Sequence, residues 1–98
     1  MKKGDVVTLM TMAGEIIGRV AESDYETITL TAPRLFVQTD EGAGFARGVC
    51  MTGAGYPAEL VFRQNQILSV VPTDDEVSED WSAVTSDVEV PATSEIAL

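Results

Sequence analysis

The sequence predicts an all-β fold: a small, strongly bent antiparallel barrel of five strands, followed by an acidic C-terminal extension. Short apolar and β-branched runs, some of them alternating with polar residues, predict the strands. Turn residues separate these runs at short, fairly regular intervals, as in small barrels and sandwiches. A glycine inside the second run, Gly18, predicts a sharp bend. The 98 residues limit the chain to one small domain, for which association between copies is a natural source of stability.

The first three strands follow one another as a meander joined by two tight turns. The first turn contains Gly14, which can adopt positive φ, and the second is Ser23-Asp24-Tyr25. The three strands are expected at Val6–Met12, Glu15–Glu22 and Glu26–Thr31.

The second half of the chain begins at Pro33, which cannot donate a hydrogen bond to a sheet and should end or kink the third strand. Arg34–Thr39 can resume it. The loop Asp40–Gly44 then reads as the tip of a hairpin that pairs Leu35–Thr39 with Phe45–Met51. The last two strands are expected at Glu59–Arg63 and Ile67–Val71, joined by the polar turn Gln64–Gln66.

Charge divides the chain into a predicted barrel domain, 1–73, and an acidic tail, 74–98. The net charge is −10, and the tail holds eight acidic residues and no basic one. All six basic residues lie in 1–73 with the other eight acidic ones, so the body carries only −2. This tail is either a disordered, solubilising segment or one that docks through Trp81 and an edge strand at Asp87–Pro91.

Several kinds of chemistry are not expected from this composition. The chain has no histidine, which removes the commonest general base and the usual zinc ligand. Its single cysteine, Cys50, lies in an apolar context typical of a buried structural thiol. The acidic groups at 40–41 and 74–76 are typical of solvated surface charge, although carboxylates alone could bind a hard cation. We therefore expect a non-enzymatic protein without a cofactor or metal.

The expected location is the cytoplasm. No apolar run is long enough to span a bilayer, and the start Met1–Asp5 is not followed by the apolar core of a signal peptide. We expect no membrane partner. The acidity also argues against a broad basic face for phosphate backbones.

Two short motifs resemble those of the Sm-like family, which comprises the Sm and LSm proteins and the bacterial host-factor RNA chaperone. In the first, Gly18 is followed two residues later by apolar Val20 and six residues later by Asp24. In the second, Phe62–Val70 reads apolar, Arg, Gln in place of Gly, Asn, any residue, Ile, and then alternating apolar residues. The motifs stand in the family's order, and the missing N-terminal helix suggests a phage-borne or marine branch.

The resemblance implies a bent five-stranded barrel whose fourth strand pairs with the fifth strand of the next subunit. Glu59–Arg63 would then pair with Ile67–Val71 of a neighbour, in a closed homo-oligomeric ring of about five to seven subunits. The family binds single-stranded RNA with the turns after strands two and four, which correspond here to residues 24–26 and 63–65. DNA is an alternative ligand.

The resemblance places the nucleic-acid-binding residues in these two turns. An arginine plane and an aromatic ring stack on a base while an amide reads its edge. Arg63, Asn65 and Asp24 match the family pattern. Gln64 replaces its glycine, and Tyr25 is an aromatic residue one place early.

Two departures leave simpler roles open. Glu26 stands where the stacking residue is expected, and Ile28 stands where an asparagine is expected. Asp24 is equally explained as a turn residue, Tyr25 as an exposed turn aromatic, and Arg63 as an ion-pair partner across a subunit interface.

Two functions follow as hypotheses. The first is a ring that binds single-stranded RNA in RNA processing or regulation, with added phosphate contacts from Lys2, Lys3, Arg19, Arg34 and Arg47. The second is a non-enzymatic interaction or structural ring of viral origin, which binds no nucleic acid and uses its acidic tail to contact a basic partner.

Overall fold

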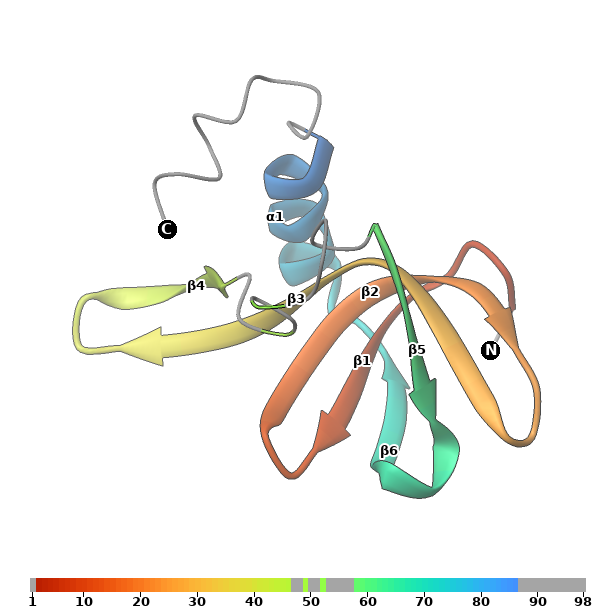
Figure 1. Ribbon diagram of the computed structural model, residues 1–98. Helices are drawn as coiled ribbons and strands as arrows, with labels where there is room; N and C mark the ends of the chain where they lie inside the picture. Colours follow the sequence, from red (N-terminus) through yellow and green to blue (C-terminus); the bar gives the residue numbers. More distant parts are fainter. Residues whose placement is uncertain (1, 47–48, 50–51, 53–57, 87–98) are drawn as a thin grey trace.

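The computed structural model describes residues 2–46, 49, 52 and 58–86. These residues are mostly β, as predicted, and Figure 1 shows the strands with one α-helix beside them. The elements are β1 (Val6–Thr11), β2 (Gly14–Ser23), β3 (Thr27–Thr39), β4 (Gly42–Ala46), β5 (Glu59–Arg63), a single 3-10 turn (Gln64–Gln66), β6 (Ile67–Pro72) and α1 (Asp75–Thr85).

All strand pairs are antiparallel, and the long strand β3 organises the sheet. The strand order is β4-β3-β2-β1-β6, and β5 also pairs with β3. The first part of β3, from Thr27 to Thr31, pairs with β5, whereas the second part, from Leu35 to Thr39, pairs with β4. Within the described residues the sheet is open, because its end strands β5 and β6 each pair on one side only.

The hydrophobic core lies on the concave side of this sheet. Its buried residues alternate along β1, β2 and β3, which is the pattern that places side chains on one face of a strand. Partly buried Leu35, Phe62, Ile67 and Val70 pack against it. The buried residues of this cluster are Val7, Leu9, Ile16, Val20, Ile28 and Leu30.

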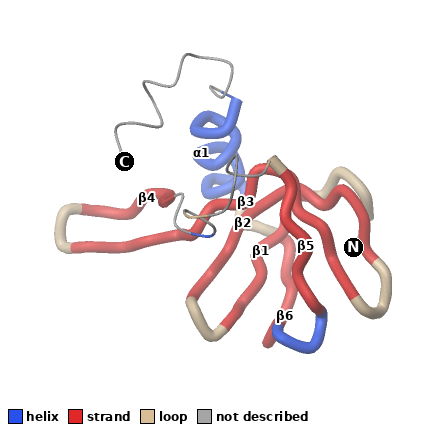
Figure 2. The backbone as a smooth tube through the Cα atoms, in the orientation of Figure 1, coloured by secondary structure: helices blue, strands red, loops and turns tan. Residues whose placement is uncertain are grey.

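The bend predicted at Gly18 is confirmed, and it coincides with a bulge in β3. Ile17 pairs with Arg34 and Arg19 pairs with Thr31, so two residues of β3, Ala32 and Pro33, lie opposite Gly18 alone. A Cβ on Gly18 would lie only 2.9 Å from Leu30 Cβ and 3.3 Å from the carbonyl oxygen of Thr31. The glycine therefore allows the two strands to approach where they bend (Figure 2).

Of the two outcomes expected at Pro33, an end of the third strand or a kink, the structure shows the kink, because β3 continues through Pro33 to Thr39. Ala32 takes φ of 51°, in the left-handed region. Its N–H donates to the carbonyl oxygen of Ala58 at 2.7 Å rather than to β2. Pro33 sits in the bulge, where no hydrogen bond from its nitrogen is required, so the strand kinks and resumes.

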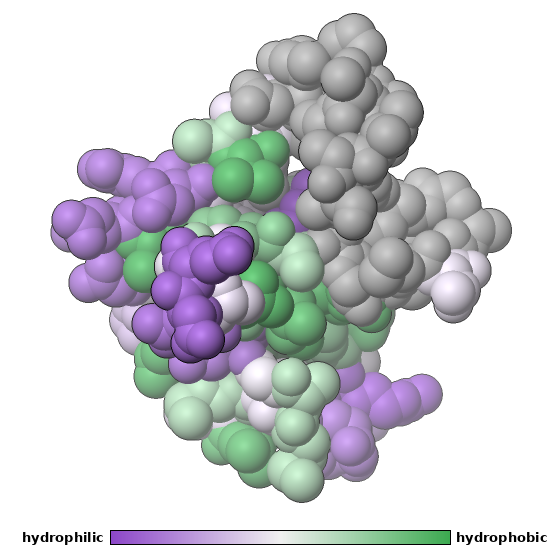
Figure 3. Space-filling model, turned by 90° about the vertical axis from the view of Figure 1, so that its left-hand side faces the viewer, coloured by the Kyte–Doolittle hydropathy of each residue, from purple (hydrophilic) through white to green (hydrophobic). Residues whose placement is uncertain are grey.

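The sheet has six strands rather than the expected five, because residues 35–46 form a projecting hairpin, here called the arm. Its turn is shorter than predicted: Thr39 pairs with Gly42, whose φ is 130°, so β4 begins at Gly42 and not at Phe45. Phe36 and Phe45 pack edge to face across it, with ring centroids 5.8 Å apart. Figure 3 views the molecule from the side on which the arm projects. The hydrophilic tip of the arm is nearest the viewer, and apolar surface lies behind it.

Part of the acidic tail is helical, which the sequence reading did not foresee. Asp74 caps α1 by accepting hydrogen bonds from the backbone N–H groups of Glu76 and Val77 at 3.1 and 3.3 Å. Trp81 is 3% exposed, and its Nε1 donates to the carbonyl oxygen of Ala32 at 3.0 Å. The helix is thus attached at the bend of β3 (Figure 1). The predicted edge strand Asp87–Pro91, Arg47 and Cys50 lie outside the described residues.

Candidate nucleic-acid interface

The turn between β2 and β3 is held by Asp24. Its Oδ1 accepts hydrogen bonds from the backbone N–H groups of Thr27 and Glu26, each at 2.8 Å. These two bonds, the one from Thr27 first, lower the pKa of the Asp24 carboxyl below its ordinary value of 3.8. The ionised carboxylate therefore stabilises the turn above that value, and this contribution is lost as the pH falls through the lowered pKa.

The turn between β5 and β6 is joined directly to the first turn by Gln64. Its side-chain Nε2 donates to the carbonyl oxygen of Asp24 at 3.0 Å. Its backbone N–H donates to the carbonyl oxygen of Glu26 at 2.8 Å. The structure thus brings together the two turns that the sequence proposed as one site, and Gln64 is the residue that connects them.

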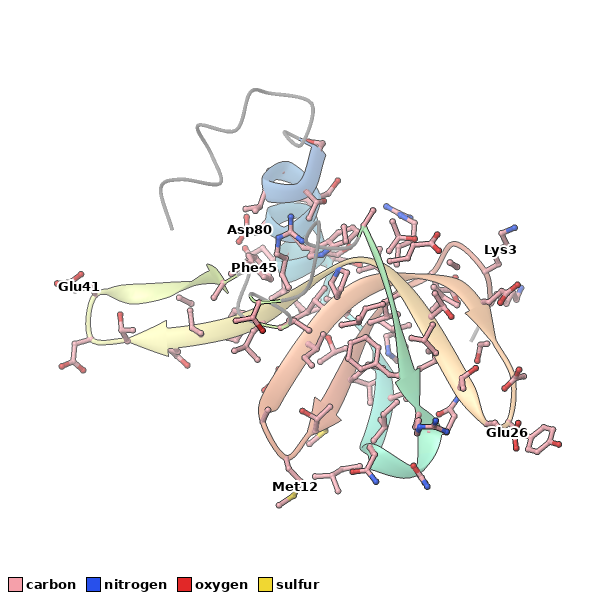
Figure 4. The ribbon with its side chains drawn as sticks, in the orientation of Figure 1. Lys3, Met12, Glu26, Glu41, Phe45 and Asp80 are labelled. Atoms are coloured by element: carbon pink, nitrogen blue, oxygen red, sulfur yellow. The ribbon has the colours of Figure 1, made fainter. Side chains whose placement is uncertain are left out.

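The other proposed site residues are exposed around this junction. Tyr25 is 89% exposed, and Arg63 and Asn65 are also exposed. Arg63 pairs with Thr27 at the start of β3, which places it one strand away from the Tyr25 turn. Glu26 lies at the tip of the same turn, as Figure 4 shows, so a carboxylate stands among these groups.

Two of the basic residues expected to contact RNA phosphates, Arg34 and Arg19, instead make contacts within the protein. Arg34 is 8% exposed, and its Nη1 donates to the carbonyl oxygen of Pro33 at 3.0 Å, so its role in phosphate binding is corrected to a structural one. Arg19 donates to the carbonyl oxygen of Gly4 at 2.8 Å and lies over the Trp81 ring. Lys2 and Lys3 are exposed, and Lys3 points away from the body (Figure 4).

A pocket of about 230 Å³ lies on the other side of Arg63, and the sequence reading missed it. It forms because the pairing of Thr11 with Ile67 brings the β1–β2 turn beside the β5–β6 turn. Figure 1 shows the three turns along one edge of the molecule. We call it the turn-edge pocket; its lining residues are Thr11, Met12, Ala13, Ile16, Phe62, Arg63, Gln66 and Ile67.

The described residues contain no group of three or more His, Cys, Asp or Glu side chains placed to hold a metal ion. In the same part of the chain, no helix has the length and apolar character needed to cross a membrane.

No protein-family model matches the chain, and no curated protein matches it.

Proposed function

We propose that this protein is a non-enzymatic Sm-like module that assembles into a ring and binds single-stranded RNA at the joined turns. The observation that carries the proposal is the pair of hydrogen bonds from Gln64 to the carbonyl oxygens of Asp24 and Glu26. They hold two turns from distant parts of the sequence in one arrangement. A binding group that is fixed in advance loses less conformational entropy when its ligand arrives.

The exposed side chains around this junction are of the kinds that bind unpaired bases. The Tyr25 ring and the Arg63 guanidinium offer flat surfaces for stacking, and the Asn65 amide can donate to and accept from a base edge. Asp24 is occupied by the turn itself, so its role in the proposal is to shape the backbone and not to contact RNA.

The strand order supports assembly of copies. β5 and β6 each have one side that pairs with no other strand among the described residues. They also carry exposed apolar side chains: Val61 is 60% exposed and Leu68 is 66% exposed. Pairing β5 of one subunit with β6 of the next would satisfy both edges and shield these side chains, and repetition of that contact closes a ring.

Native mass spectrometry tests the assembly directly. Protein purified without nuclease should give one species of about five to seven subunits, because a heterologous contact between fixed edges closes at one number. Additional mass that nuclease removes would show that the ring carries nucleic acid. A monomer across the working concentration range would contradict the proposed assembly.

Replacing Arg63 by alanine should weaken binding of a fluorescently labelled single-stranded RNA by ~1–3 kcal/mol, the usual effect of losing one stacked contact. Lys3→Ala is the matched control, since it also removes one exposed positive charge but lies outside the joined turns. Fluorescence anisotropy at constant salt measures both variants. Equal losses in the two would show that Arg63 contributes no more than a phosphate contact of the kind expected of Lys3, and would contradict stacking by its guanidinium.

The carboxylates near the site favour a second candidate function. Asp24 and Glu26 flank Tyr25, and α1 presents Asp75, Glu76, Glu79 and Asp80 as exposed groups. These charges repel phosphate and attract basic surfaces. A ring that carries no nucleic acid in the mass spectrum, and binds no labelled RNA, would favour an interaction or structural module whose partner is basic.

A further inference from the structure

We propose that the turn-edge pocket is a nucleobase-binding site, which receives a base of the RNA strand that crosses Arg63. This inference rests on the proposed function and adds a second contact to it. The strand would run along one edge of the molecule, from the Tyr25 turn, over Arg63, to the pocket beside the β1–β2 turn.

The floor of the pocket suits the face of a base. It is formed by Ile16, Phe62 and Ile67, which are core or near-core side chains and therefore hold a fixed shape. Met12 lines the pocket and is 88% exposed, and Figure 4 shows it at the tip of the β1–β2 turn. The flexible thioether side chain of Met12 can adjust its position to pack against the flat face of a base.

The rim supplies the polar groups that a base edge and its phosphate require. The exposed Gln66 amide can donate to and accept from a base edge, and the Arg63 guanidinium can donate to a base carbonyl or a phosphate. Thr11 has no free donor to offer, because its hydroxyl donates to the carbonyl oxygen of Gly14 at 2.9 Å; it also accepts from the N–H of Ala13 at 3.1 Å.

The distribution of charge favours the turn-edge pocket over the β2–β3 turn as the place where a base and its phosphate bind beside Arg63. On the side of the β2–β3 turn, the carboxylates of Asp24 and Glu26 oppose an anionic polymer. On the side of the turn-edge pocket, Arg63 is the sole charged lining residue. A base with its phosphate therefore meets a cation without a competing carboxylate in the pocket, whereas it meets both at Tyr25.

The variant Met12→Asp tests the pocket without disturbing the core, because Met12 is exposed and lies in a turn, where aspartate is well tolerated. It should weaken binding of labelled oligouridylate or oligoadenylate by about fivefold, the effect of one like-charge contact in water. Val84→Asp on α1 is the control, since Val84 is also exposed and acquires the same charge away from the pocket. That variant should bind RNA as the unmodified protein does.

Photo-crosslinking with a thiouridine-containing RNA gives an independent readout. Crosslinked peptides that contain Met12 or Gln66 would support the pocket. Two outcomes would overturn the inference and leave the proposed function standing: equal affinities of Met12→Asp and Val84→Asp, or crosslinks confined to Tyr25 and its neighbours. If the unmodified protein binds neither oligonucleotide, the inference and the RNA-binding function both fail.

Discussion

Replacing Trp81 by alanine is expected to destabilise the protein by about 3–5 kcal/mol, because it removes a large buried side chain. The ring is 3% exposed, its Nε1 donates to the carbonyl oxygen of Ala32, and the Arg19 guanidinium lies 5.5 Å from the ring centroid. Alanine would leave a cavity between α1 and the sheet and remove the partner of a carbonyl at the bend. Urea unfolding followed by circular dichroism measures the change, which avoids depending on the fluorescence of the chain's one tryptophan.

Two further substitutions separate the contributions of Trp81. Trp81→Phe keeps most of the ring but loses the hydrogen bond, so it should cost ~1 kcal/mol beyond its smaller packing loss. Val84→Ala truncates an exposed residue of the same helix and should change stability little. If Trp81→Ala is no more destabilising than Val84→Ala, the helix does not contribute to the stability of the sheet.

The sequence allowed most strands to be predicted, because their residues obey local rules. Alternating apolar residues and turn residues located β1, β2, β5 and β6 to within one or two positions. A kink at Pro33 was one of two expected outcomes, but the bulge that produces it could not be predicted, because it lies opposite Gly18, on the other strand. The pairing partner of a residue is a tertiary property, which the local pattern does not contain.

The sequence of α1 contains features that predict a helix, but the acidic composition of the segment drew attention away from them. Asp74 is a favourable N-cap, and Asp75 and Glu76 are acidic residues in the first turn. Val77, Trp81 and Thr85 follow at helical spacing, and the latter two are buried. The absence of basic residues suggested a solvated tail, and Trp81 suggested a docked one. The structure shows a helix with one buried face, which includes Trp81.

The motif spacing predicted that the two turns lie together, but not which residue joins them. Motif spacing identified the two turns, and the hydrogen bonds of Gln64 join them. Gln64 stands where the second Sm-like motif has a glycine. Because a glycine has no side chain, the motif gave no sign that this position would join the turns through a side chain. The turn-edge pocket could not be foreseen, because Met12 and Gln66 meet only through the pairing of β1 with β6.

Replacing Gly18 by alanine is expected to destabilise the fold by about 1–3 kcal/mol, the usual result of forcing atoms into a packed core. The new Cβ would lie 2.9 Å from Leu30 Cβ and 3.3 Å from the carbonyl oxygen of Thr31. Leu30 is fully buried, so it has no open space to move into, and the carbonyl belongs to the backbone of β3. The two strands would have to separate at the bend. Gly18→Val should cost more, although valine otherwise favours strands.

Gly44→Ala provides the matched control for the bend. Gly44 also lies within a strand, but a Cβ there would have no neighbour within 4 Å. Alanine at that position should be neutral or slightly stabilising, because it reduces the conformational freedom of the unfolded chain. A comparison of the two alanine variants by urea unfolding isolates the steric effect from the general effect of replacing a glycine. If both variants unfold at the same urea concentration with equal slopes, the close approach of β2 and β3 at Gly18 is not required, and the bend must be maintained by the Ala32–Pro33 bulge and Trp81.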